Sequence, residues 1–267
     1  MIISPSLPVY YEIVASPESN KPWLTLLHGF TQNRKIFDRQ VSRFQAYFRL
    51  LLVDLRGHGG SARHDGPFGI EEYTQDLIAV LNAAGIEQTH YWGTHTGSAV
   101  GLKLAHQQPE RVISLVLEGT VIPGLDVPEV SKHLNRAKSI ARSSGVEAAM
   151  IDWFEHGDWY SVLRLHPRRC RAKEQRDILR EFSGKPWLTD LTPHPVSSLV
   201  EYLPAIQQPT LVYNGEFDLP GFKNAAGVLE SNLPHVTRKE IKGAGSFAGW
   251  EAPQLVNTLV FNFLDAI

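Results

Sequence analysis

Three side chains that could cooperate in acyl-transfer chemistry each follow a segment with the character of a buried strand. His95 lies at the centre of Gly93-Thr94-His95-Thr96-Gly97, Asp218 closes a polar turn, and Ser246 lies in a glycine-rich loop near the C-terminus. The Gly-x-His-x-Gly spacing permits a sharp turn between a strand and a helix, with the central side chain standing above a sheet. An imidazole, a hydroxyl and a carboxylate could supply a base, a nucleophile and an orienting acid.

The elements that must position these side chains alternate between strands and helices. Three nearly continuous apolar runs are typical of strands buried on both faces of a parallel sheet: Trp23–Leu27, Arg49–Asp54 and Val112–Leu117. Between the second and third runs, apolar residues recur at helical spacing from Tyr73 until Gly85 ends the pattern. This alternation predicts an α/β fold with a mostly parallel sheet flanked by helices.

The pattern changes between about residues 121 and 203, where charged helical stretches occur without a clear buried strand. We expect this segment to be a helical insertion. Its aromatic side chains could line a ligand site or hold the insertion to the core, and the sequence leaves both possibilities open. These side chains are Trp153, Phe154, Trp159, Tyr160, Phe182 and Trp187.

The motifs and their order resemble those of the α/β-hydrolase superfamily. The resemblance rests on the glycine frame around His95, on His28-Gly29 after the first apolar run, and on Asp54-x-Arg56-Gly57-His58-Gly59. It implies an eight-stranded, mostly parallel sheet with a helical cap inserted after strand 6. Residues 1–122 and 206–267 would then form the core, and residues 123–205 the cap.

The same resemblance implies a nucleophilic serine at position 95 and a catalytic histidine at position 246, whereas this chain has His95 and Ser246. Asp218 keeps the position of the acid, so the triad is complete but transposed. The resemblance further implies that the N–H groups of Phe30 and Thr96 stabilise an oxyanion.

In the superfamily, His28-Gly29 opens the loop that carries the Phe30 donor, so we include both residues in the candidate site. His28 could equally be a loop-packing residue and Gly29 only a turn. We expect His58 to be structural rather than catalytic.

The number of donor hydrogens on Asp218, Ser246 and His95 favours one arrangement of hydrogen bonds among them. An ionised Asp218 would take the single hydrogen of Ser246, since a charge-assisted bond is stronger than one to neutral imidazole. His95 would then donate to the Ser246 oxygen and keep its other nitrogen as an acceptor facing the pocket. That arrangement suits His95 as a general base, with a rate that rises through an ionisation near neutral pH.

Other chemistry stays open. Ser246 could be the nucleophile, or His95 could attack covalently and form a labile acyl-imidazole. We expect an enzyme of hydrolase type acting on a small apolar carbonyl compound, such as an ester, a lactone or a C–C bond next to a carbonyl. The alternative is an inactive small-ligand-binding protein that kept the pocket and lost the reaction.

Composition narrows the partners. A net charge of -2 and a pI near 6.6 give no electrostatic reason to expect nucleic acid or an anionic membrane as a partner. The single cysteine, Cys170, excludes an intramolecular disulfide, and the N-terminus lacks the pattern of a signal peptide, so we expect a cytoplasmic protein. We expect a small-molecule partner, no metal and no cofactor; the sequence predicts no oligomeric state.

Overall fold

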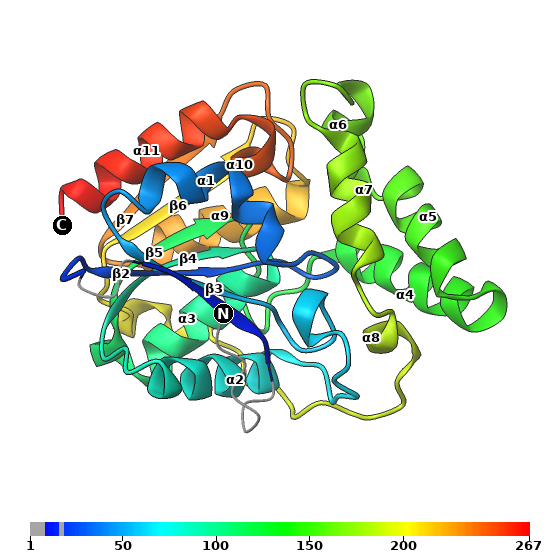
Figure 1. Ribbon diagram of the computed structural model, residues 1–267, viewed down its shortest axis with the longest axis horizontal. Helices are drawn as coiled ribbons and strands as arrows, with labels where there is room; N and C mark the ends of the chain where they lie inside the picture. Colours follow the sequence, from blue (N-terminus) through cyan, green and yellow to red (C-terminus); the bar gives the residue numbers. More distant parts are fainter. Residues whose placement is uncertain (1–8, 16–18) are drawn as a thin grey trace.

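The computed structural model describes residues 9–15 and 19–267, which contain a seven-stranded sheet (Figure 1). The strand order is β1-β3-β2-β4-β5-β6-β7; only β1 is antiparallel to its neighbour. The predicted α/β fold is confirmed, but the described residues hold seven strands rather than eight, and residues 1–8 lie outside them. The strands are β1 (Tyr11–Val14), β2 (Trp23–Leu27), β3 (Arg49–Val53), β4 (Thr89–Thr94), β5 (Val112–Glu118), β6 (Thr210–Gly215) and β7 (Val236–Ile241).

Helices cover both faces of the sheet, which is why its central strands are apolar along their whole length. Helices α1 (Asp38–Phe44), α10 (Ala248–Glu251) and α11 (Pro253–Asp265) share one hydrophobic cluster with the sheet. Helices α2 (Ile70–Ala83), α3 (Thr96–Gln107) and α9 (Pro220–Asn232) share the other, and Figure 1 shows α2 and α3 on the opposite side of the sheet from α1 and α11. None of the described helices is long and apolar enough to cross a membrane.

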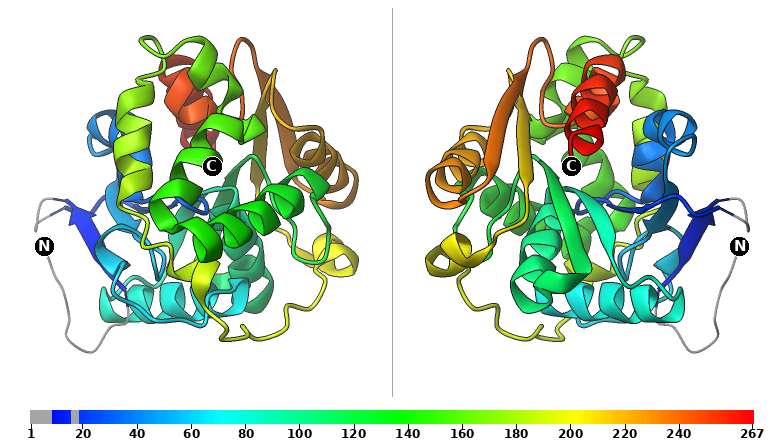
Figure 2. Two further views of the ribbon diagram at one scale, coloured as in Figure 1. Left: turned by 90° about the vertical axis from the view of Figure 1, so that its right-hand side faces the viewer. Right: turned by 90° about the vertical axis from the view of Figure 1, so that its left-hand side faces the viewer.

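A helical insertion separates β5 from β6 and lies beside one end of the sheet (Figures 1 and 2). It follows β5, the fifth strand of the described chain, rather than a sixth. Its aromatic residues Trp153 and Trp187 belong to the same hydrophobic cluster as the sheet residues Leu24 and Trp92. The division at residues 122 and 205 stays a prediction. The helices of the insertion are α4 (Pro128–Ser144), α5 (Val146–His156), α6 (Ser161–Leu165), α7 (Ala172–Arg180) and α8 (Lys185–Leu188).

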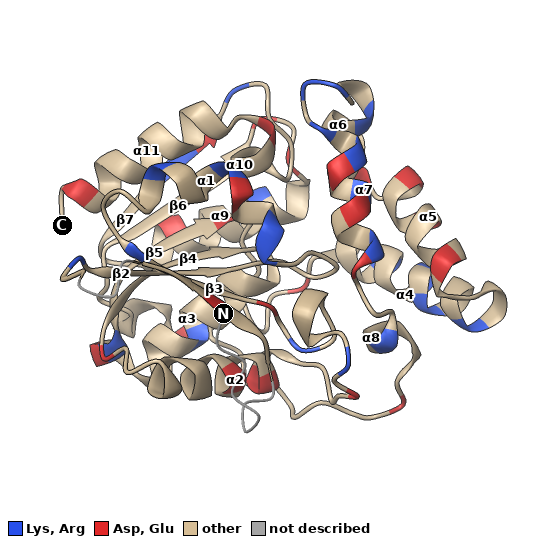
Figure 3. Cartoon of the chain, viewed as in Figure 1, with Lys and Arg blue, Asp and Glu red and all other residues tan. Residues whose placement is uncertain are grey.

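Positively and negatively charged residues are mixed along the helices of the insertion (Figure 3). On α7, Asp177 pairs with Lys173 and with Arg180, at 2.9 and 2.8 Å. These exposed pairs contribute little to stability. They do neutralise one another locally, so the outer face of α7 presents no field of a single sign.

The turn from β4 into α3 depends on a close approach that only glycine permits. A Cβ added at Gly97 would lie 2.1 Å from the carbonyl oxygen of Leu27 on the neighbouring strand. The hydroxyl of Tyr91 donates to the carbonyl oxygen of Gly97 over 2.6 Å, which holds the start of α3 against β4. The backbone therefore arrives at residue 95 in a tightly constrained position.

We predict that Gly97→Ala lowers the free energy of unfolding by about 3 kcal/mol or more, because the new methyl group would overlap backbone that cannot move aside. The control is Gly227→Ala in α9, where the nearest contact to an added Cβ is the flexible guanidinium of Arg238 at 3.4 Å. Since alanine favours a helix more than glycine does, that variant should be as stable as the parent or gain up to about 1 kcal/mol. Urea unfolding measures both, and equal effects would contradict the steric account of the turn.

Candidate active site

His95 stands at the tip of the turn between β4 and α3 with a backbone that a non-glycine residue rarely adopts. Its φ is 48° and its ψ is -110°, and it is held there because its N–H donates to the carbonyl oxygen of Glu118 over 2.8 Å. A strained residue that persists in a well-determined turn is a common feature of active sites. The glycine frame in the sequence thus locates a true elbow, with an imidazole at its apex.

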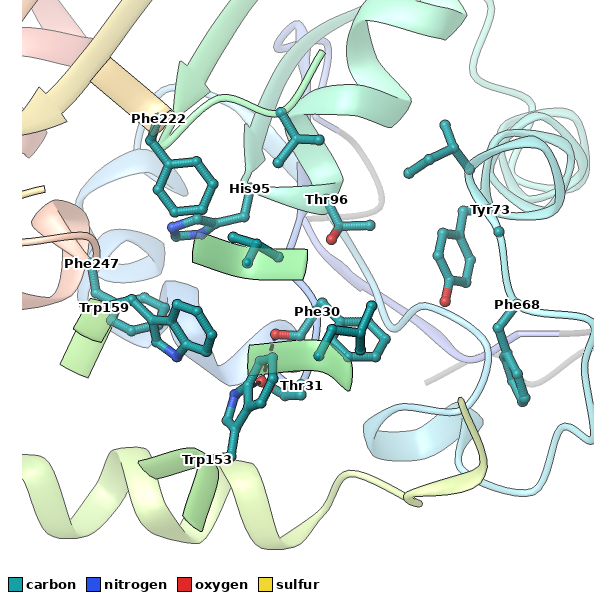
Figure 4. A pocket seen from close by; sticks show the side chains of 15 residues that line it. Phe30, Thr31, Phe68, Tyr73, His95, Thr96, Trp153, Trp159, Phe222 and Phe247 are labelled. Carbon is teal, nitrogen blue, oxygen red and sulfur yellow. Dashed lines mark hydrogen bonds between the residues drawn. The ribbon is translucent and has the colours of Figure 1, made fainter. Parts of the chain in front are cut away.

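Two glycines and two phenylalanines enclose the His95 ring. A Cβ at Gly29 would lie 3.0 Å from His95 Cβ, and one at Gly119 would lie 2.6 Å from His95 Nε2. The rings of Phe222 and Phe247 lie 5.0 and 5.3 Å from the imidazole centre (Figure 4). The ring is therefore largely buried, at 9% exposure.

Burial determines the ionisation of His95. Desolvation lowers its pKa to about 4, and the nearby backbone of Ser246 opposes this decrease only in part. The imidazole is therefore neutral at neutral pH, which differs from the ionisation near neutral pH that the sequence predicted. Its Nε2 is buried without a hydrogen-bond partner among the described residues.

Ser246 and Asp218 form a pair beside this ring. The Ser246 hydroxyl donates a hydrogen bond to the Asp218 carboxylate, as we predicted from the single hydrogen of the serine. Asp218 also accepts from the side chain of Asn214 over 2.6 Å and from the N–H of Leu219 over 2.8 Å. Burial raises the pKa of Asp218, and these three donors act in the opposite direction.

The expected hydrogen bond from His95 to the Ser246 oxygen is absent from the described residues. A serine hydroxyl is short, and here it is turned toward the buried carboxylate of Asp218. Ser246 is 1% exposed and does not line the pocket, whereas His95 does. The relay that the sequence predicted is therefore interrupted between His95 and Ser246.

The loop after β2 faces the elbow and presents a free donor. The N–H groups of Phe30 and Thr96 donate to no other group within residues 9–15 and 19–267, and both residues line the pocket. Thr31 has a positive φ of 63°, and its hydroxyl accepts from Trp153 Nε1 on α5 over 3.0 Å. The insertion thus contacts the loop that carries one of the two donors.

His28 and Gly29 support this loop, and neither of them lines the pocket. His28 is fully buried, its Nδ1 donates to the carbonyl oxygen of Gly29 over 2.8 Å, and its Nε2 accepts from the N–H of Leu55 over 2.9 Å. Both ring nitrogens are therefore occupied, which makes His28 a loop-packing residue. Gly29 lets the loop approach the His95 side chain.

The pocket above His95 is apolar. It has a volume of about 280 Å³, and none of the described residues that line it has a side chain charged at neutral pH. Such a lining favours a small neutral ligand. The residues that line it are Phe30, Thr31, Phe68, Gly69, Ile70, Tyr73, His95, Thr96, Val121, Val130, Leu134, Trp153, Trp159, Phe222 and Phe247 (Figure 4).

The aromatic residues of the insertion divide between the two roles that the sequence left open. Trp153 and Trp159 line the pocket. Tyr160 stacks on Phe247 with centroids 5.0 Å apart, and Phe182 lies 5.4 Å from Phe30, so these side chains hold the insertion to the core. Phe154 packs on Tyr160 at 4.6 Å, and Trp187 packs on Phe182 at 4.8 Å. Sequence reasoning missed Tyr73 and Phe222 as pocket residues, because each lies on the apolar face of a helix and has the pattern of a core residue.

Two further carboxylates accept hydrogen bonds from the backbone near Ser246, between β7 and α11. Glu118 accepts from the N–H of Gly249 over 2.7 Å, and Glu251 accepts from the N–H of Gly245. Burial raises the pKa of Glu118 to about 8 and that of Glu251 to about 7. Neither carboxylate lines the pocket, so both act on the loop and not on a ligand.

Comparison with known proteins gives the family. Residues 22–144 match the model of the "alpha/beta hydrolase fold" family. A protein of Azorhizobium caulinodans named "Putative carbamate hydrolase RutD" is 40% identical, covering 97% of this chain and 96% of its own. The chain therefore belongs to the α/β-hydrolase family, and its relatives place it among the hydrolases of that superfamily.

Other similar proteins agree with this placement. "Carboxylesterase YbfK" of Bacillus subtilis is 27% identical over 94% of this chain and 83% of its own. The crystal structure of the enol-lactonase from Burkholderia xenovorans LB400 superimposes with a TM-score of 0.83 at 23% identity, covering 96% of each chain. That superposition supports the fold alone.

We predict that the free energy of unfolding decreases at acid pH because the imidazole of His95 is buried. Because the pKa of His95 falls from 6.5 in the unfolded chain to about 4 on folding, the unfolded chain binds the proton more tightly. The contribution of His95 is complete above about pH 6.5 and is lost as the pH falls toward about 4. Between about pH 7 and about pH 5, the free energy of unfolding should decrease by about 2 kcal/mol because of His95.

Urea unfolding of the parent and His95→Gln at the two pH values measures this difference. The parent should lose about 2 kcal/mol more than the variant on acidification. His166→Gln, at an exposed histidine, is the matched control and should follow the parent. A His95→Gln variant with the parent's pH dependence would show that the ring is protonated as easily in the folded chain as in the unfolded one.

Proposed function

We propose that this protein hydrolyses small, neutral, largely apolar carbonyl compounds, namely esters, lactones or carbamates, with His95 as a general base. The observation that carries the proposal is that one apolar pocket brings together the His95 ring and two residues, Phe30 and Thr96, whose backbone N–H groups are free. Residues 123–205 act as a cap that covers this pocket. The names of the relatives include a carbamate hydrolase and a carboxylesterase, which supports the choice of substrate class.

The reaction begins with water rather than with a side-chain nucleophile. A neutral imidazole accepts a proton from a water molecule as that water attacks the carbonyl carbon. Nε2 of His95 is the nitrogen without a partner among the described residues, and the ring must turn enough for water to reach it. The proton then passes from the imidazolium to the leaving group.

The negative charge that develops on the carbonyl oxygen is stabilised by the N–H groups of Phe30 and Thr96. Since neither group donates elsewhere in the described chain, no hydrogen bond must break when the substrate binds. Trp153 fixes the loop that carries Phe30 by its bond to Thr31. Asp218 and Ser246 lie outside the lining of the pocket and do not touch the substrate.

We predict that His95→Ala lowers kcat/KM by about 100-fold or more for neutral esters, lactones and carbamates. The parent rate should be constant from about pH 6 to neutral pH and decline through a pKa of about 4, because only the neutral ring accepts a proton. Ser246→Ala is the control; it should retain the acidic limb and most of the rate. Unchanged kcat/KM in His95→Ala would remove His95 from the reaction.

We also predict that exchanging both positions, His95→Ser with Ser246→His, creates ordinary esterase activity on p-nitrophenyl butyrate. A histidine at 246 would lie beside Asp218, and a serine at 95 would lie beside the free N–H groups. Each single exchange supplies two serines or two histidines and should remain at least about tenfold slower than the double variant. Additive effects would show that the two positions do not act as a pair.

A ligand-binding protein without turnover is the second candidate. The observation that favours it is the absence, within the described residues, of a hydrogen bond between His95 and the Ser246–Asp218 pair. In that case ligands would raise the melting temperature and no carbonyl compound would be hydrolysed.

A further inference from the structure

Tyr73 brings a hydroxyl into the apolar pocket. The residue lies on α2, lines the pocket and is 3% exposed. Figure 4 shows its hydroxyl pointing away from α2, with Thr96 between it and His95 in that view. Within residues 9–15 and 19–267 this hydroxyl makes no hydrogen bond, and its oxygen keeps some accessible surface, so it is open to the pocket that the residue lines.

Three other buried tyrosines use their hydroxyls inside the protein; Tyr11 on β1, like Tyr73, makes no hydroxyl hydrogen bond among the described residues, but it does not line the pocket. The hydroxyl of Tyr91 donates to a carbonyl oxygen over 2.6 Å, that of Tyr160 accepts from Gln32 over 3.0 Å, and that of Tyr213 accepts from Trp92 over 3.0 Å. The Tyr73 hydroxyl differs from these three because it has no partner within the described residues and is open to the pocket, where a ligand can reach it.

The charged groups near Tyr73 do not satisfy it. Arg56 donates to both carboxylate oxygens of Asp76 over 2.6 Å and to the carbonyl oxygen of Pro67 over 3.1 Å. The guanidinium and carboxylate thus bind each other. Burial raises the pKa of the Tyr73 phenol far above its ordinary value, so the group stays protonated and available as a donor.

We propose that Tyr73 is a specificity-determining residue that donates its hydroxyl hydrogen to a second oxygen atom of the substrate. The substrate class is then a neutral carbonyl compound whose apolar body carries an oxygen acceptor, a ketone or ether oxygen for example, away from the reacting carbonyl. The inference rests on the proposed function in one respect: the reacting carbonyl lies beside His95. The second oxygen binds where Tyr73 faces the pocket.

The test uses ligands that cannot be hydrolysed, so that it does not depend on turnover. Straight-chain methyl ketones of increasing length are each paired with the diketone that carries a second ketone oxygen on the penultimate carbon at the far end. Dissociation constants are measured by NMR titration for the parent, for Tyr73→Phe, and for Tyr47→Phe as the control. Tyr47 is 51% exposed and does not line the pocket, and its substitution removes the same atom.

At the length that spans the two sites, the parent should bind the diketone about five- to tenfold more tightly than the monoketone. Tyr73→Phe should lose this preference and bind the monoketone as well as the parent does; Tyr47→Phe should behave as the parent. Because the ring is retained, thermal unfolding should show that Tyr73→Phe is folded.

Three results would overturn the inference: no diketone preference in the parent at any length, a preference that survives in Tyr73→Phe, or no binding of either series. The proposed hydrolysis fails separately, when the diketone preference is present but no neutral ester, lactone or carbamate is cleaved. If the parent hydrolyses esters but shows no diketone preference, the role of Tyr73 is wrong and the proposed reaction stands.

Discussion

The close packing of the loop after β2 against the turn between β4 and α3 is the constraint on which the site depends. Gly97 lies so near the carbonyl oxygen of Leu27 that any side chain would collide, and a Cβ at Gly29 would lie 3.0 Å from the Cβ of His95. In this packing His95 keeps its positive φ. The free N–H groups of Phe30 and Thr96 belong to residues that line the same pocket, so the proposed oxyanion donors are assembled by backbone packing rather than by side chains.

Backbone features were therefore predictable from the sequence. Glycine spacing marks the elbow at His95, and long apolar runs mark strands such as Arg49–Val53, because both patterns follow from local steric and burial requirements. The strand count was harder to obtain. The short segment Tyr11–Val14 pairs only at an edge, and residues 1–8 lie outside the described structure.

Side-chain relations were less predictable. The hydrogen bond from Ser246 to Asp218 could be predicted from the number of donor hydrogens. The absence of a bond from Ser246 to His95 could not, because it depends on how the His95 ring packs against Gly119 and two phenylalanines. The low pKa of His95 has the same origin, since burial depends on the tertiary surroundings and not on neighbours in sequence. Tyr73 was not predicted as a pocket residue for a related reason. The apolar pattern of a helix shows which side faces inward, but it does not distinguish a core residue from one that lines a cavity.

The ionisation of His95 and the character of the pocket support each other. A protonated imidazole at this place would need a counter-charge, but Asp218 is engaged by Ser246, Asn214 and Leu219, and none of the described residues that line the cavity is charged. The neutral ring is thus the stable form, and a neutral ring can accept a proton but cannot neutralise the charge of an anion. A carboxylate or phosphate substrate would enter with its charge uncompensated, at a high cost in desolvation. Under the proposed function, the same burial that weakens His95 as a base therefore also favours the neutral compounds on which such a base could act.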